Sequence, residues 1–363
     1  MTTTAQQRSV VVVGGGMIGC AVAAALRVRG HEVTLCEGAT TGGEASFAAA
    51  GILGPQLEHD EDGPAVDLGL AGRAATLAWV RAIREETGVD IELGAPGALV
   101  KAMDDDDARA LERRVTWQRA RGLRAEWRAD AREAFFVDDT TVDTRAYAHG
   151  LAALARRRGA RVLTGVPVTG LLRDADGVRG VTLADGDELR ADHVVVCAGA
   201  WSTTVPGVAE AASLPKGAVF PVRGQIVELV GPPGLVPTMV YGGKGYVVPR
   251  RDGRLICGST MEKVGFDKSV TAGGVKMVLE KAITLVPAVA ELRVNATWAG
   301  LRPATLDGLP LIGATRTPGL LLATGHLRNG VLLAAITGEL MGAILDGERP
   351  ELARVGDPAR LAR

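Results

Sequence analysis

Hydrophobic and polar positions near the N-terminus follow first a strand pattern and then a helix pattern. Residues 9–13 are a serine followed by four valines, a β-branched run typical of a buried parallel strand. Residues 17–29 then predict a helix that ends at Gly30. A second apolar run at 32–36, closed by Glu37, completes a βαβ unit, for which a right-handed crossover is expected.

The rest of the chain alternates between helical and extended patterns. Further helices are predicted over residues 66–87, 104–121, 143–158, 271–285 and 329–345. Further strands are predicted over residues 97–102, 161–173, 178–183, 193–197, 219–230, 238–241, 246–250, 254–259 and 320–323. The four aspartates at 104–107 are interpreted as a cap that matches the helix dipole, because adjacent residues do not converge on one metal ion.

The strand-rich middle of the chain lies between two α/β portions, which predicts a discontinuous layout. A chain of 363 residues is long for one hydrophobic core, so two domains are expected. We predict an α/β fold in which a Rossmann-like domain is assembled from residues 1–86, 143–217 and 298–363. A smaller domain, an antiparallel sheet flanked by helices, is predicted from residues 87–142 and 218–297.

The loop between the first strand and the first helix carries a dinucleotide-binding pattern, Gly14-Gly15-Gly16-Met17-Ile18-Gly19. Gly14 permits a tight turn, Gly16 lets the backbone approach a pyrophosphate, and Gly19 allows close packing of helix and strand. The helix N-terminus offers N–H groups to the phosphates, and Glu37 can accept from ribose hydroxyls. The alternative is a purely structural glycine turn. The loop predicts a dinucleotide but does not separate FAD from NAD.

Composition and charge exclude several classes of protein. A net charge of −1 provides no field for nucleic acid or an anionic membrane, so neither partner is expected. Four cysteines, none in a CxxC pair, fit a reducing compartment and argue against a zinc or other metal site. The sequence shows no apolar signal region and no stretch able to span a bilayer, so a cytoplasmic protein is expected.

A second glycine-rich turn lies far along the chain, between the apolar run that starts at Leu320 and the helix predicted from Asn329. A helix N-terminus beside a cofactor suits a flavin, because the reduced ring carries negative charge at N1 and the C2 carbonyl. The alternative is an ordinary strand-to-helix turn with Asn329 as its N-cap, and the spacing alone does not decide between them.

Residues 325–332 resemble the GHxRNG(I/V)LL motif of the glycine oxidases, which belong to the D-amino-acid-oxidase group of flavoproteins. The resemblance runs in order from about residue 10 to 345, and further stretches that carry it are 48–56, 193–202, 221–225, 245–250, 258–262 and 298–310. It implies an FAD-binding domain of the GR2 type, a smaller substrate domain and a homo-oligomer, often a tetramer. Related sarcosine oxidases can attach FAD through cysteine, but residues 297–307 contain none, so noncovalent FAD is expected.

The resemblance implies which residues contact the cofactor. The glycine loop and Glu37 hold the adenosine and pyrophosphate. Along the rest of FAD the implied contacts are Ser46, Ala49, Ala50, Gly51, Val168, Ala198, Gly199, Trp201, Gly300, Arg302, His326, Leu327, Arg328, Asn329, Gly330, Val331 and Leu332.

Arg302 is the leading candidate at the reaction centre, because a guanidinium fork binds a planar carboxylate through two parallel N–H bonds. The resemblance implies that Arg302 holds the substrate carboxylate, that Tyr246 reaches the same group, and that Arg328 lies near the flavin and the substrate. Gly51 and Met261 are expected to wall the substrate space. His326 is interpreted as an orienting residue rather than a general base.

The resemblance also implies the chemistry. A hydride passes from the substrate Cα to flavin N5, oxygen reoxidises the flavin to give hydrogen peroxide, and the imine is hydrolysed to ammonia and a 2-oxo acid. Glycine, sarcosine and small D-amino acids are the expected substrates, and in bacteria this family supplies the imine for thiamine thiazole synthesis. Lys244 departs from other members, so the substrate lid is expected to differ. Leu327 replaces a common aromatic, with a small expected effect.

Three alternatives stay open at this point. One is a dehydrogenase of D-amino acids or N-methyl amines that passes electrons to another acceptor. Another is a flavin module of an RNA-modifying enzyme, which the neutral charge disfavours. The third is an FAD-binding protein without catalysis, against which the presence of Arg302 argues.

Overall fold

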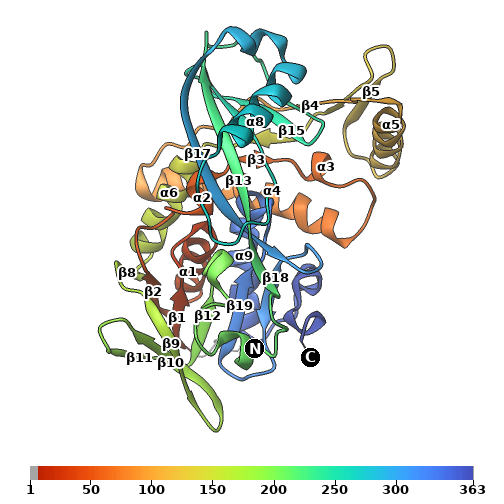
Figure 1. Ribbon diagram of the computed structural model, residues 1–363. Helices are drawn as coiled ribbons and strands as arrows, with labels where there is room; N and C mark the ends of the chain where they lie inside the picture. The colour runs from red at the N-terminus through yellow and green to blue at the C-terminus, as the bar shows by residue number, and fades with distance from the viewer. Residues whose placement is uncertain (1–6, 363) are drawn as a thin grey trace.

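A six-stranded sheet forms the lower part of the molecule in Figure 1, in a computed structural model that describes residues 7–362. Its strand order is β18-β19-β12-β1-β2-β8, and β1 runs parallel to both β12 and β2. β18 is antiparallel to β19 at one edge. The strands are β1 (Ser9–Val13), β2 (Glu32–Glu37), β8 (Arg161–Thr164), β12 (His193–Val196), β18 (Leu311–Ala314) and β19 (Leu320–Thr324).

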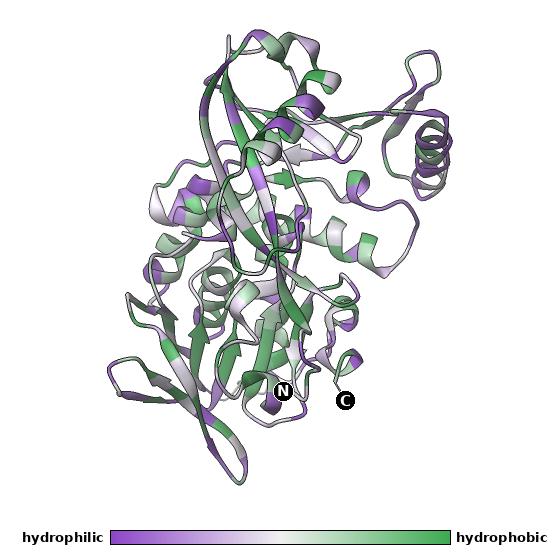
Figure 2. Ribbon diagram, in the orientation of Figure 1, coloured by the Kyte–Doolittle hydropathy of each residue, from purple (hydrophilic) through white to green (hydrophobic). Residues whose placement is uncertain are grey.

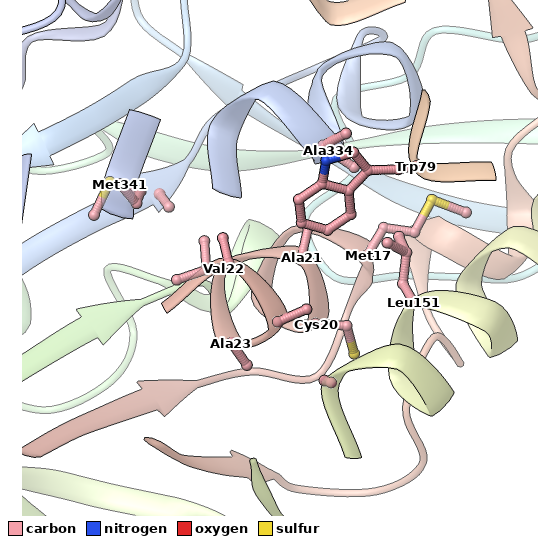
Figure 3. Close-up of a cluster of buried hydrophobic side chains, with 14 of the residues drawn as sticks. Met17, Cys20, Ala21, Val22, Ala23, Trp79, Leu151, Ala334 and Met341 are labelled. Carbon is pink, nitrogen blue, oxygen red and sulfur yellow. The ribbon is translucent and has the colours of Figure 1, made fainter. Parts of the chain in front are cut away.

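Both faces of this sheet are covered, which explains the continuous apolar runs of its central strands, green in Figure 2. Four helices pack together on one side: α1 (Met17–Val28), α4 (Pro64–Thr87), α6 (Thr144–Arg157) and α9 (Gly330–Leu345). Figure 3 shows their shared core, where Ala21 and Val22 of α1 lie among Trp79, Leu151 and Met341. The core keeps α1, and with it the glycine loop, in a fixed position at the strand end.

The opposite face carries a three-stranded antiparallel sheet of β9 (Val168–Asp174), β10 (Gly177–Leu183) and β11 (Glu188–Arg190). Val178 and Val181 of this sheet pack against Val194 and Val196 of the central sheet. Figure 1 shows its tip extending from the lower left of the molecule. The arrangement buries the second face of the central strands without a helix.

A larger, mostly antiparallel sheet forms the upper part of Figure 1, with strand order β17-β13-β16-β15-β14-β4-β6-β5. Val227 and Val247 of this sheet pack under α8 (Ala272–Leu285), and α5 (Asp105–Ala120) lies beside the outer hairpin. The strands are β4 (Ala98–Lys101), β5 (Ala125–Arg128), β6 (Glu133–Phe136), β13 (Val219–Val230), β14 (Met239–Gly242), β15 (Gly245–Pro249), β16 (Arg254–Gly258) and β17 (Arg293–Thr305). The fold is therefore the expected α/β arrangement with a smaller antiparallel part.

Short elements connect the two sheets. A two-stranded sheet pairs β3 (Ile52–Leu53) with β7 (Thr140–Thr141). The remaining elements are α2 (Ala45–Ala48), α3 (Pro55–Glu58), α7 (Val208–Ala211) and the 3-10 helices η1 (Gly199–Trp201), η2 (Pro287–Glu291), η3 (Glu351–Gly356) and η4 (Pro358–Arg360). Several of them border the space between the sheets, so they shape the site described below.

The predicted helices are confirmed to within about two residues, and so is the aspartate cap, in which Asp104 accepts from the backbone N–H of Asp107 at 2.8 Å. The single strand predicted over 161–173 is wrong. The chain leaves the central sheet at Gly165, whose φ is +71°, and re-enters at Val168 as part of the small sheet. The patterns also missed β17 as a strand, because exposed and half-buried positions alternate irregularly along its first half.

Other expectations concern chemistry and the membrane. All four cysteines are free and buried. In the described chain no cluster of potential metal ligands was found, and no helix is long and apolar enough to cross a bilayer. The division into residues 1–86, 143–217 and 298–363 on one side and 87–142 and 218–297 on the other remains our proposal.

Candidate active site

A cavity of about 850 Å³ lies between the two sheets, a size within the usual range for ligand sites. One end is lined by the strand ends of the central sheet, including Val13, Cys36 and Cys197. The other end is lined by the antiparallel sheet, including Tyr246 and Arg302. A ligand that fills it must therefore be elongated, with chemically different ends.

The glycine loop forms the first end. Gly14 has a φ of +104°, and a Cβ on Gly19 would lie 1.9 Å from the carbonyl oxygen of Gly14, so only glycine fits there. The carboxylate of Glu37 accepts from the backbone N–H of Gly15 at 2.7 Å and from that of Ala39 at 2.8 Å. Glu37 thus fixes the loop and also lines the cavity.

The N-terminus of α1 faces the same space. Gly16, at the N-cap, has no side chain to accept from the helix, and in the described chain Ser46 accepts from the N–H of Met17 at 3.0 Å. Gly16 and Ile18 line the cavity beside these groups. An uncapped helix N-terminus at a glycine turn binds phosphate, so this end fits a pyrophosphate.

A second helix N-terminus, that of α9, meets the middle of the cavity. The turn before it has Gly325 at φ +77° and Leu327 at φ +46°, and Leu327 donates its N–H to the carbonyl of Pro303 at 2.8 Å. Asn329 occupies the N-cap position but makes no side-chain cap bond. Gly330 and Val331 line the cavity here, so this helix end is open to a group that carries negative charge.

His326 lies in this turn and is buried. Its Nε2 is 3.0 Å from the hydroxyl of Thr337 on α9, and its Nδ1 has no hydrogen-bond partner among the described residues. Burial lowers the pKa of His326 to about 3, so the ring is neutral at ordinary pH. An unpartnered buried nitrogen beside the cavity fits a site that a polar ligand completes. Together with the two open helix N-termini, it supports FAD in extended form.

Arg302 lies on β17 at the far end of the cavity and is half-buried. Its Nη2 donates to the hydroxyl of Ser259 at 2.7 Å and its Nη1 to the carbonyl of Thr260 at 3.1 Å. No ion pair involves Arg302 within residues 7–362. Burial lowers its pKa from the usual value. The guanidinium is thus held by neutral acceptors, and its charge is left for a ligand.

Two glycines that the sequence analysis gave no role make room for this end. A Cβ on Gly224 would lie 2.1 Å from Nη1 of Arg302. A Cβ on Gly258 would lie 2.3 Å from the hydroxyl oxygen of Tyr246. Burial raises the pKa of Tyr246, and its side chain interacts electrostatically with those of Ser259 and Arg302. Tyr246 and Arg302 therefore form one polar cluster.

Arg328, unlike Arg302, forms an ion pair within the described chain. Its Nη2 donates to a carboxylate oxygen of Glu58 at 2.5 Å, and Glu58 raises the pKa of Arg328. Tyr241 interacts electrostatically with the same guanidinium. Glu58 and Tyr241 both line the cavity, and the sequence analysis named neither. Since Glu58 is the last residue of a four-residue helix, no periodic pattern could mark it.

Most of the residues predicted for the cofactor and the substrate line this one cavity. Gly51, Met261, Val168 and Trp201 are among them, although they come from four separate parts of the chain. Four predicted residues do not line it: Gly15, Gly19, Asn329 and Leu332. The first two shape the glycine loop, and the other two lie at the start of α9. Lys244, in the tight turn at φ +59°, also lines the cavity.

A cavity for an extended dinucleotide, between a Rossmann-like sheet and an antiparallel sheet, is the arrangement of FAD-dependent oxidoreductases. The family model described as FAD dependent oxidoreductase (DAO) matches residues 9–344. The chain belongs to this family.

Its relatives narrow the class. The glycine oxidase of Geobacillus kaustophilus (strain HTA426) is 36% identical over 371 residues, covering 98% of this chain and 96% of that protein. A crystal structure of glycine oxidase from Geobacillus kaustophilus matches with a TM-score of 0.90 at 33% identity and covers 98% and 99% of the two chains. The bifunctional protein ThiO/ThiG of Nostoc sp. (strain PCC 7120) is 33% identical over 93% of this chain and 52% of its own length. The chain is an FAD-dependent oxidoreductase that acts on amines.

Proposed function

We propose that the protein oxidises glycine and related small amines, sarcosine and small D-amino acids among them, and releases the corresponding imine or 2-oxo acid. One observation carries the proposal. The guanidinium of Arg302 lies in the cavity with no ion-pair partner in the described chain, so it can bind the carboxylate of an α-amino acid. The similarity to glycine oxidases supports this choice of substrate.

The protein's own residues bind and orient the substrate. Arg302 receives the carboxylate in its N–H fork, and the hydroxyl of Tyr246, in the same cluster, donates to it. Gly51 and Met261 bound the space beside the Cα. The His326 ring is engaged with Thr337 and is difficult to protonate, so it orients the turn and moves no proton. Bound FAD supplies the acceptor for the hydride that leaves the Cα.

The cofactor contacts that we propose are the backbone groups of the glycine loop and α9, with Glu37 at the ribose. Oxygen as the final electron acceptor, with hydrogen peroxide as the product, is part of the proposal. We also propose that FAD is bound noncovalently, that the protein forms a homo-oligomer, and that its product is used in the thiazole step of thiamine synthesis. The match to a ThiO/ThiG protein, of which this chain spans about half the length, supports the last point.

The test begins with anaerobic mixing of the purified flavoprotein with glycine, sarcosine and D-alanine in turn. Loss of the oxidised flavin absorbance is expected with each, followed by rapid recovery and peroxide formation when air is admitted. Bleaching with slow recovery in air would instead identify a dehydrogenase with another electron acceptor. No bleaching by glycine or sarcosine would overturn the proposed substrate class.

A variant tests the role of Arg302. Truncating one partner of a desolvated charge pair costs on the order of 2–5 kcal/mol, so Arg302→Ala should lower kcat/KM for glycine about 30-fold or more while FAD stays bound. Arg109→Ala, at an exposed ion pair on α5, is the matched control and should leave kcat/KM unchanged. Unchanged turnover by Arg302→Ala would remove this residue from the site.

A further inference from the structure

Arg302 takes its position from a short segment, Ser259 to Met261, that follows β16. The hydroxyl of Ser259, the carbonyl of Thr260 and the sulfur of Met261 all accept from its guanidinium, at 2.7, 3.1 and 3.5 Å. Because these neutral acceptors hold the guanidinium of Arg302, their positions set its orientation. The direction of the fork therefore depends on what fixes this segment.

Thr260 is the point at which the segment is anchored, and it is buried, with 2% of its surface exposed. Its hydroxyl donates to Oε2 of Glu262 at 2.6 Å and accepts from the backbone N–H of Gln225 at 3.0 Å. The same residue thus offers its carbonyl to Arg302 and its hydroxyl to Glu262. A shift of the Glu262 carboxylate would be passed directly to an acceptor of Arg302.

Glu262 is held in turn by a dense set of donors. Its Oε2 accepts from Nε2 of Gln225 at 2.8 Å and from Nε of Arg223 at 3.2 Å, and its Oε1 accepts from Nη2 of Arg223 at 2.9 Å. Arg223 and Glu262 also exchange two backbone hydrogen bonds, at 2.9 and 3.0 Å. The Arg223 guanidinium lowers the pKa of Glu262 to about 2. The carboxylate is therefore ionised at neutral pH and held in place by these donors.

Arg223 connects this network to the strand that carries Arg302. It lies on β13, where it pairs with Leu301, while its neighbour Val222 pairs with Arg302 itself. Its guanidinium is buried, with 4% exposed, and also binds Asp267 at 2.6 Å. Asp267 is half exposed and, in the described structure, forms hydrogen bonds with Arg223 and Ser269 but not with Thr260. The inner carboxylate of Glu262 and the outer one of Asp267 can thus be tested separately.

We propose that Glu262 is a positioning residue for substrate recognition: clamped by Arg223, it holds Thr260 so that the fork of Arg302 faces the carboxylate of the substrate. The inference rests on the proposed function, because it assumes that Arg302 binds the carboxylate of the substrate. A bidentate site loses affinity when its fork is turned by a small angle, because both N–H bonds must align together. Glu262 therefore acts on carboxylate binding without touching the substrate.

The test measures carboxylate binding with and without turnover. In Glu262→Gln the amide keeps the size of the side chain but places an N–H₂ group among the donors of Arg223, Gln225 and Thr260. The dissociation constant of acetate, measured calorimetrically on the FAD-loaded enzyme, should rise about 10-fold. The KM for glycine should rise to a similar extent, with kcat within 2-fold of wild type. Asp267→Asn is the matched control, and both constants should stay within 2-fold.

Two results would overturn the inference. One is an acetate dissociation constant unchanged in a folded Glu262→Gln enzyme, and the other is an equal rise in Asp267→Asn, which would indicate general loosening of the loop. If Glu262→Gln does not fold, Thr260→Val removes the same link and carries the same expectation. Acetate binding needs no oxidation, so a wild type that binds acetate but is not reduced by glycine would contradict the proposed function alone.

Discussion

The two ends of the cavity are built in opposite ways. The pyrophosphate end consists of consecutive residues, the loop from Gly14 to Gly19, with Glu37 closing it. The substrate end consists of residues from β13, β14, β15 and β17 and from the segment after β16, which are brought together by strand pairing. One end presents backbone N–H groups and the other presents a guanidinium and a phenol.

This difference determines which structural changes would disrupt each end of the cavity. The geometry of the glycine loop is set by residues within the loop. Its binding properties therefore depend on a few backbone angles and on the close approach of Gly19 to the carbonyl oxygen of Gly14. The substrate end depends on register: Tyr246 pairs with Gly258, Ile226 also pairs with Gly258, and Val222 pairs with Arg302. A slip of one residue would turn these side chains to the other face of the sheet. Substitutions should therefore separate cofactor binding from substrate binding.

The largest effect is expected at the pyrophosphate end. In Gly19→Val a side chain must fit where a Cβ would lie 1.9 Å from a backbone oxygen, so α1 has to move away from the strand. The expected result is loss of at least 90% of the bound FAD. The ratio of flavin to protein absorbance after purification measures it.

A matched control for this variant is Gly170→Val in β9, where a Cβ would meet no atom within 4 Å. It should purify with a full complement of flavin. If Gly19→Val retained its flavin, the close approach of α1 to the loop would not be what limits cofactor binding.

An intermediate effect is expected at the substrate end. In Gly224→Ala the new methyl group overlaps the guanidinium of Arg302, a flexible group that can be displaced. We expect the KM for glycine to rise about 10-fold, equivalent to about 1.4 kcal/mol, with FAD content unchanged. Steady-state kinetics and the absorbance ratio check the two parts separately.

Gly273→Ala in α8, where a Cβ meets nothing within 4 Å, is the control and should leave both values unchanged. Loss of FAD from Gly224→Ala would contradict the separation of the two ends. An unchanged KM would show that Arg302 tolerates displacement.

The same difference explains what the sequence could and could not predict. The βαβ unit and the glycine loop follow from periodicity and spacing, because the residues involved are neighbours in the chain. Arg302 and Tyr246 were proposed mainly through the resemblance, because the neighbouring sequence does not show that their side chains lie on the cavity side of the sheet. Glu58 and the space-making role of Gly224 were missed, because each acts on a partner more than 70 residues away. Contacts of that kind depend on register and packing, which no local pattern records.

The smallest effect is expected at the turn between the two ends, where His326 is buried and neutral. Its pKa is lowered to about 3 in the folded protein, whereas an exposed histidine titrates near 6.5. Between these values the unfolded chain binds a proton that the folded chain does not, so this group stabilises the fold above pH 6.5 and progressively less as the pH falls toward 3. His326→Gln removes that dependence, and it also removes or weakens the bond to Thr337.

At pH 7 we therefore expect His326→Gln to have a Tm about 1–2 °C below wild type, which corresponds to about 1 kcal/mol for one altered buried hydrogen bond. At pH 4.5 the difference should shrink or reverse, because the wild type has lost the contribution of its neutral imidazole. Thermal unfolding of the FAD-loaded proteins across this range measures it, with the exposed His149→Gln as a control that should follow wild type. A constant difference at all pH values would mean that the imidazole titrates equally in both states.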